Sequence, residues 1–168
     1  QMVKARREKC FRKFLGIQAR CLEPVPLRTF VVLQHARKKI RDILMDYSAD
    51  EHESLCKFSS NATTLSPRAK SDLDLKLKGP ISGSRHHIDW FKGVLNRDSL
   101  LHEVCSSGQL TEVDSLGYTT VPKKYDIDRG IMPNTTIGSF FSSGLGKMIR
   151  TRLRNAGLNL RYLPEKHN

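Results

Sequence analysis

The chain has 168 residues, a length typical of one domain, and its hydrophobic content of 38% is low but sufficient for a core. Its 29 Lys and Arg residues outnumber 17 Asp and Glu, so the net charge is +12, which predicts affinity for a polyanion and not a particular fold. The longest strongly apolar run, FVVL at 30–33, is far shorter than a membrane span requires.

The charge is concentrated at the two ends of the chain. Residues 1–41 carry 12 basic and 2 acidic residues, for a net charge of +10, and residues 123–168 carry 9 and 3, for +6. Residues 42–122 carry 8 and 12, for −4. This distribution predicts that folding brings the two basic ends to one face of the protein.

The four cysteines argue against a metal centre. They are Cys10, Cys21, Cys56 and Cys105. None forms a C-x-x-C pair or has paired His ligands at a short spacing, so no zinc site is expected. Scattered thiols without a secretory signal are typical of a reducing cytosol.

The N-terminal third predicts two basic helices. Residues 4–20 form an amphipathic pattern with Phe11, Phe14 and Leu15 on one side, and the EPVP segment at 23–26 ends it. A second helix is expected over 28–46. Residues 58–84, rich in Ser, Thr, Lys and Asp, are expected to form a long loop, followed by a helix over 85–97.

The last third predicts short strands and one long helix. Strands are expected at 110–113 and 118–122, joined by the turn DSLG, and a third at 127–132. Thr135 or Thr136 then caps a helix that reaches about Ala156, with Gly157 ending it. These elements predict a mostly helical α+β fold with a small antiparallel sheet.

On that last helix the apolar and basic residues separate. Lys147, Arg150 and Arg154 form one stripe beside an apolar arc that includes Phe140 and Phe141. Arg152 falls inside the arc, so it must find a buried partner or reach out of the core. The GLGK segment at 144–147 lacks the full phosphate-loop pattern and lies within the helix, so we assign it no phosphate-binding role.

The segment YTTVPKKYDIDRGIM at 118–132 carries three close cations, Lys123, Lys124 and Arg129. A hairpin can direct such side chains at one point, where Lys offers a compact charge and Arg a planar fork for phosphate oxygens. A hairpin whose cations are merely solvated would show the same pattern. No nucleophile motif and no convincing pair of carboxylates is present, so no catalytic or metal-binding residue is predicted.

Several motifs resemble one family. They are VPK at 121–123, Asp128-Arg129, Ile131, Phe140-Phe141, the G-x-G at 144–146, RTRLR at 150–154 and GLNL at 157–160. Upstream, FSSNATT at 58–64 and ARKKI at 36–40 fit the same pattern. This arrangement resembles the fingers region of the RNA-directed RNA polymerase of small single-stranded RNA bacteriophages, the levivirus replicase. The resemblance covers roughly residues 8–168, and Pro133-Asn134-Thr135 departs from the family's turn.

The resemblance implies roles for the cations. Lys123, Lys124 and Arg129 would hold the triphosphate of the incoming nucleotide, and Lys147, Arg150 and Arg154 would face the RNA template. It also implies replication in the cytoplasm of the bacterial host, with host translation proteins as further partners and no membrane. The whole chain, 1–168, would be one fingers fragment, with a basic helical part (1–57), a loop region (58–84) and a part holding the hairpin and the long helix (85–168).

The resemblance also implies where the catalytic metal belongs. In such polymerases Mg²⁺ is held by palm aspartates that follow the GLNL segment, and this chain has no D-x-x-x-x-D or G-D-D. We therefore expect a fragment of a longer enzyme that does not polymerise RNA by itself. Two alternatives stay open: a non-enzymatic basic RNA-binding module, and a peripheral protein that uses residues 4–20 to bind anionic membranes.

Overall fold

The computed structural model describes residues 2–24, 26–66, 72–124 and 127–160, which form a mostly helical α+β molecule. The elements in chain order are α1 (Met2–Cys21), α2 (Leu27–Leu44), α3 (Ala49–Leu55), α4 (Leu73–Lys78), β1 (Pro80–Gly83), α5 (Arg85–Arg97), α6 (Ser99–Cys105), β2 (Gln109–Glu112), β3 (Thr119–Lys124), β4 (Ile127–Ile131) and α7 (Thr136–Asn155). The predicted fold class is confirmed, and the helices expected at 4–20, 28–46 and 85–97 are present.

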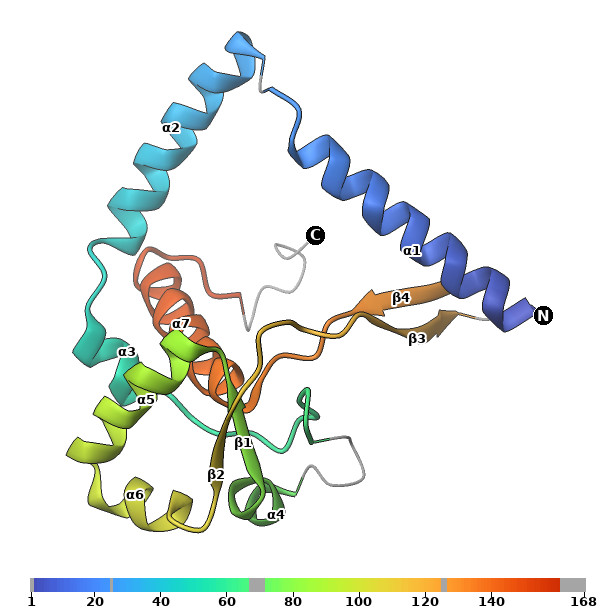
Figure 1. The fold of residues 1–168 in the computed structure, drawn as a ribbon. Helices are drawn as coiled ribbons and strands as arrows, with labels where there is room; N and C mark the ends of the chain where they lie inside the picture. Colours follow the sequence, from blue (N-terminus) through green and yellow to red (C-terminus); the bar gives the residue numbers. More distant parts are fainter. Residues whose placement is uncertain (1, 25, 67–71, 125–126, 161–168) are drawn as a thin grey trace.

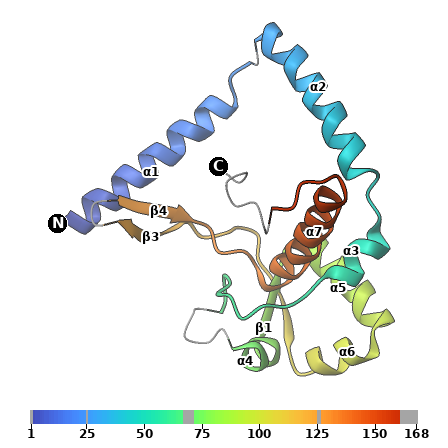
Figure 2. The same cartoon turned by 180° about the vertical axis from the view of Figure 1, so that it is seen from behind.

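Helices α1 and α2 are two arms outside the packed body of the molecule. Figures 1 and 2 show them as the sides of an open V that meet between Cys21 and Leu27. The prolines of the EPVP segment separate the two helices, since proline disfavours helix both at its own position and in the residue before it. Helix α1 contacts β4, and α2 contacts α7. The two basic ends of the chain therefore touch each other through these elements.

The core lies between α7 and the elements around β1. Its buried apolar residues are Leu77, Ile81, Ile88, Phe91, Val94, Cys105, Ile137, Phe140 and Phe141. Trp90 stacks on Phe141 with ring centroids 4.0 Å apart. The prediction that Phe140 and Phe141 are core residues is confirmed. Each such side chain contributes about 1.5–3 kcal/mol on burial, so the core fixes α7 in place.

The predicted hairpin between residues 110–113 and 118–122 is wrong, although both strands exist. β2 pairs with β1 in parallel, with Ile81 opposite Leu110, and the crossover between them contains α5 and α6. β3 pairs with β4 instead, in an antiparallel two-stranded sheet. The sequence DSLG therefore connects two separate sheets, and Figure 1 shows β3 and β4 extending away from the body that holds β1 and β2.

The predicted loop over 58–84 is wrong in its second half, which contains α4 and β1. The Pro, Gly and Ser residues at 79–84 suggested a turn, but Ile81 and Ser82 are completely buried. Small residues are needed here because the backbone is crowded: a Cβ atom on Gly83 would lie 2.9 Å from the Ile137 side chain. β1 is therefore a short buried strand, and α6 is a helix that the sequence analysis did not predict.

Gly144 allows α3 and α7 to approach closely. A Cβ atom at this position would lie 2.5 Å from Cys56 Sγ and 2.7 Å from the His52 carbonyl oxygen. The GLGK segment lies inside α7, as predicted. Its first glycine thus has a packing role, which explains the sequence without a phosphate-binding loop.

Candidate functional site

The three clustered cations lie on the β3–β4 hairpin, and all three are exposed. Arg129 lies opposite Val121, and Lys124 lies opposite Ile127. Because alternate residues of a strand share a face, and directly opposed residues do too, Lys124 and Arg129 lie on the same face of the hairpin. Lys123 is the extra residue at the irregularity between Pro122 and Lys124, so the register does not assign it to that face.

Pro122 fits this hairpin because each strand has a free edge. Proline cannot donate a hydrogen bond to a ladder, so it is tolerated at edges and beside bulges. It lies opposite Asp128, immediately before the irregularity that contains Lys123. The proline and the bulge together end the regular pairing just where the cations begin.

The opposite face of the hairpin packs against α1. The Tyr118 ring packs against Phe11 and Phe14, with both centroid distances 5.3 Å, and its hydroxyl is 3.3 Å from Cys10 Sγ. Asp128 Oδ1 lies 3.9 Å from Arg6 Nε, and the Asp128 side chain is only 4% exposed. This face is therefore an anchor, and the face with Lys124 and Arg129 is turned away from it.

The FSSNATT segment packs against the start of α7. The Thr64 hydroxyl donates to the Pro133 carbonyl at 2.7 Å, and the Thr64 amide donates to the Asn134 carbonyl at 3.0 Å. Thr135 caps α7 by accepting from the Gly138 amide at 3.0 Å, as predicted. The segment Pro133-Asn134-Thr135 is thus a scaffold turn that fixes the link between the hairpin and α7.

Lys76 holds the other end of the FSSNATT segment. It is 2% exposed, and its Nζ donates to the carbonyl oxygens of Ser59 and Asn61 at 2.8 and 2.7 Å. Burial lowers the pKa of Lys76 because it disfavours the charged form. Sequence analysis missed this lysine, which looks like one of several basic residues in a polar stretch.

The second predicted group, Lys147, Arg150 and Arg154, forms an exposed stripe on α7. Figures 1 and 2 show the hairpin running away from α7 toward the N-terminal half of α1, so the structure does not bring the two basic groups together. The predicted need of Arg152 for a partner is confirmed. Its guanidinium donates to the Leu44 and Asp46 carbonyls and to Glu51 Oε2.

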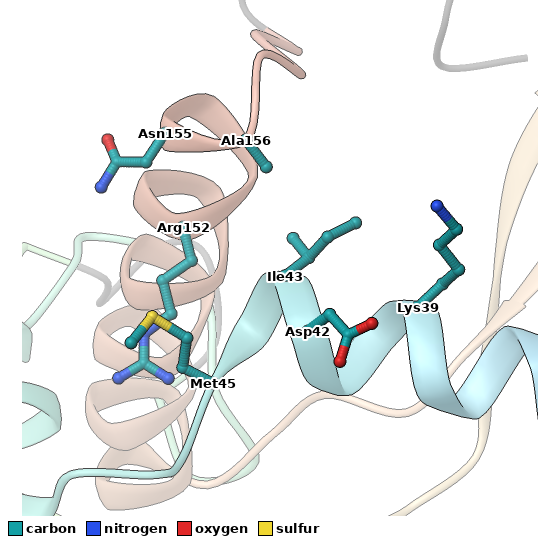
Figure 3. Close-up of a pocket in the computed structure, with 7 residues that line it drawn as sticks. All are labelled: Lys39, Asp42, Ile43, Met45, Arg152, Asn155 and Ala156. Carbon is teal, nitrogen blue, oxygen red and sulfur yellow. The ribbon is translucent and has the colours of Figure 1, made fainter.

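A pocket of about 500 Å³ lies between α2 and α7, and sequence analysis did not predict it. It is lined by Lys39, Asp42, Ile43, Met45, Arg152, Asn155 and Ala156. Figure 3 shows the Arg152 guanidinium beside Met45, while Lys39 extends from α2 on the other side of the pocket. The sequence showed a basic α2 but not which of its residues would meet α7.

Two of the thiols are held in an inert environment. Burial raises the pKa of Cys56 to about 11 and also raises the pKa of Cys105. Cys56 Sγ donates to the His52 carbonyl oxygen at 3.2 Å. The thiol form therefore predominates at neutral pH, and neither residue is suited to act as a nucleophile.

We expect iodoacetamide at pH 8 to alkylate Cys21, which is exposed, and to leave Cys56 and Cys105 largely unmodified. With a pKa near 11, only about one part in a thousand of Cys56 is thiolate at that pH. Mass spectrometry of the native protein measures the difference, and denatured protein, in which all four thiols should react, is the control. Equal labelling of Cys21 and Cys56 in the native protein would contradict the packing of α3 on α7.

Within the described ranges, no group of three or more His, Cys, Asp or Glu side chains could hold a metal ion. The described residues thus offer no cluster of ligands for a magnesium ion. No helix in the part of the chain that the structure describes is long and apolar enough to cross a bilayer.

A comparison with protein families finds a match over most of the chain. The model of the family described as RNA replicase, beta-chain, matches residues 24–162. This range includes the FSSNATT segment, the hairpin cations and the α7 stripe, whereas α1 lies outside it. No match was found among curated proteins.

Proposed function

The chain belongs to the RNA replicase beta-chain family, whose members act in viral RNA replication, and from this premise we propose that it supplies the fingers part of an RNA-directed RNA polymerase. In this role Lys124 and Arg129 hold the triphosphate of the incoming nucleotide, with Lys123 beside them. The RNA template runs over the stripe Lys147, Arg150 and Arg154. The polymerase would copy the genome of a levivirus-type phage in its bacterial host.

The shared face of Lys124 and Arg129 carries this proposal. The two side chains are exposed, come from facing strands and lie on the face of the hairpin that is opposite to α1. A triphosphate binds well to such a pair, because Arg can contact two oxygens and Lys adds a compact charge. These residues bind and orient the nucleotide. The metal-dependent step belongs to palm aspartates, for which we assign no residue here.

We expect the double substitution Lys124→Gln and Arg129→Gln to weaken the affinity of the 168-residue chain for a nucleoside triphosphate by about tenfold or more. A fluorescent ATP analogue, titrated at low salt, measures this affinity. The matched control is Arg85→Gln with Lys92→Gln, which removes the same two charges from exposed positions on α5. The control should change the affinity by less than about twofold, since distant exposed charges are screened.

The alternative, a non-enzymatic RNA-binding module, is favoured by the net charge of +12. It predicts that both double substitutions weaken binding of single-stranded RNA and nucleotide equally, because only the total charge matters. Equal losses, or no detectable nucleotide binding at low salt, would overturn the hairpin proposal. A selective loss with the hairpin substitutions would exclude the alternative.

A further inference from the structure

We propose that α1 is a clamp that positions the cationic hairpin, and that Asp128 and Arg6 are its positioning residues. This inference rests on the proposed role of Lys124 and Arg129 in binding nucleotide. In this proposal neither Asp128 nor Arg6 contacts the nucleotide. They act by holding β4 against α1, so that the opposite face keeps its orientation.

The adjacent residues Asp128 and Arg129 have different roles: Asp128 holds β4 against α1, and Arg129 binds the nucleotide. Successive side chains of a strand point to opposite faces. Asp128 points toward α1, where its side chain is 4% exposed, and Arg129 therefore points away from α1 into solvent. An acidic residue directly before the arginine thus anchors the strand from behind while the arginine stays free to bind.

Aromatic packing supports the same contact. Tyr118 packs against Phe11 and Phe14 and lies over Gly130, where a Cβ atom would come within 2.3 Å of the Tyr118 hydroxyl oxygen. Tyr118 and Gly130 therefore fit each other on the face that Asp128 shares. Two kinds of contact, apolar and ionic, hold the hairpin to α1.

The clamp is needed because the hairpin has little other support. An isolated two-stranded sheet is marginally stable in water, and Figure 1 shows this one extending from the body with α1 along it. A buried carboxylate is tolerated only when it is paired, so losing Arg6 would leave a charge that favours separation of β4 from α1. The α1 side of this contact lies outside the family match, whereas Asp128 and Tyr118 lie inside it.

The expected loss of nucleotide affinity depends on the fraction of molecules in which α1 holds the hairpin in place. If substitution leaves it in place about one tenth of the time, the apparent dissociation constant for nucleotide rises about tenfold. Arg6→Gln should have this effect, because the Asp128 carboxylate loses the cation that faces it. Adding Asp128→Asn should restore most of the affinity, since a neutral pair has no uncompensated charge.

Asp128→Asn alone separates the clamp from simple electrostatics. The substitution makes the hairpin more positive, so an electrostatic role for Asp128 predicts tighter nucleotide binding. The clamp predicts weaker binding, because the contact with Arg6 is lost. The control for the charge of α1 is Arg12→Gln, an exposed arginine whose side chain is 82% accessible, and it should change the affinity by less than about twofold.

The experiment titrates the fluorescent ATP analogue against the full chain and its variants, with hydrogen exchange of the β3–β4 amides as a second readout. Weaker binding in Arg6→Gln, faster exchange confined to the hairpin and recovery in the double variant support the clamp. Should Arg6→Gln fail to fold, Phe14→Ala, which leaves no unpaired charge, is measured in the same two ways.

The affinities of the variants distinguish a failure of the clamp from a failure of the proposed nucleotide site. Unchanged affinity in Arg6→Gln and Asp128→Asn, while the hairpin substitutions Lys124→Gln and Arg129→Gln weaken binding, would overturn the clamp and leave the nucleotide site intact. No loss of affinity with the hairpin substitutions would overturn the proposed function itself. Faster hairpin exchange in Arg6→Gln would then show only that α1 stabilises the hairpin.

Discussion

Replacing Phe141 by alanine is expected to lower the free energy of unfolding by about 4 kcal/mol, the middle of the range for a buried aromatic residue. Phe141 is 3% exposed and contacts four aromatic rings, those of His52, His87, Trp90 and Phe140. Its carbonyl oxygen also accepts a hydrogen bond from His52 Nε2 at 2.7 Å. Urea unfolding followed by Trp90 fluorescence or by circular dichroism measures the change.

Two controls make this prediction specific. Phe141→Leu keeps most of the volume and should cost less than about 1.5 kcal/mol. Phe11→Ala removes an aromatic residue of α1 that is 43% exposed, so it should leave the unfolding of the body nearly unchanged. A loss below about 1 kcal/mol for Phe141→Ala would mean that the core does not depend on the aromatic contacts between α5 and α7.

The long helices could be predicted from the sequence because their signals are local. The spacing of apolar residues predicted α1, α2, α5 and α7. Thr135, one of the two residues predicted as the cap, begins α7, and Gly157 follows its end as predicted. Gly157 has a φ of +83°, the left-handed conformation that glycine adopts readily at a helix end. Such features depend on a few neighbouring residues, so they can be recognised without knowing the rest of the fold.

The pairing of the strands could not be predicted, since it depends on contacts between distant residues. β1 has only four residues, Pro80–Gly83, and their small side chains suggested a turn. They form a strand because β2, Ile137 and Ile88 pack around them. With β1 assigned to a loop, the strand at 110–113 had no partner except the next strand along the chain.

Only the local part of the candidate site could be predicted from the sequence. The cations of the hairpin are visible as a local cluster, whereas their supports come from residues that are distant in sequence. Arg6 and Asp128 are 122 positions apart, and Lys76 reaches back to Ser59 and Asn61. A charge pattern identifies clustered cations, but it does not reveal which charges are buried to support them.

Arg152→Met should lower the free energy of unfolding by about 2–3 kcal/mol, because three charge-assisted contacts are lost together. The guanidinium donates to the Leu44 carbonyl at the end of α2, to the Asp46 carbonyl at 2.8 Å and to Glu51 Oε2 at 2.5 Å in α3. The Arg152 side chain is 13% exposed, so water cannot fully replace these partners. Methionine retains the apolar contacts of the side chain.

The substitution also tests how α2 is attached. Arg152 lines the pocket between α2 and α7 and binds the backbone where α2 ends, so its loss should increase hydrogen exchange in α2 more than in α5. Arg150→Met is the matched control, since Arg150 is exposed on the same helix and its loss should change stability by less than about 0.5 kcal/mol. Similar losses for both arginines would show that the charge of α7, and not its bond to the end of α2, stabilises this junction. A selective loss for Arg152 would show that this half-buried guanidinium connects α2 to the body.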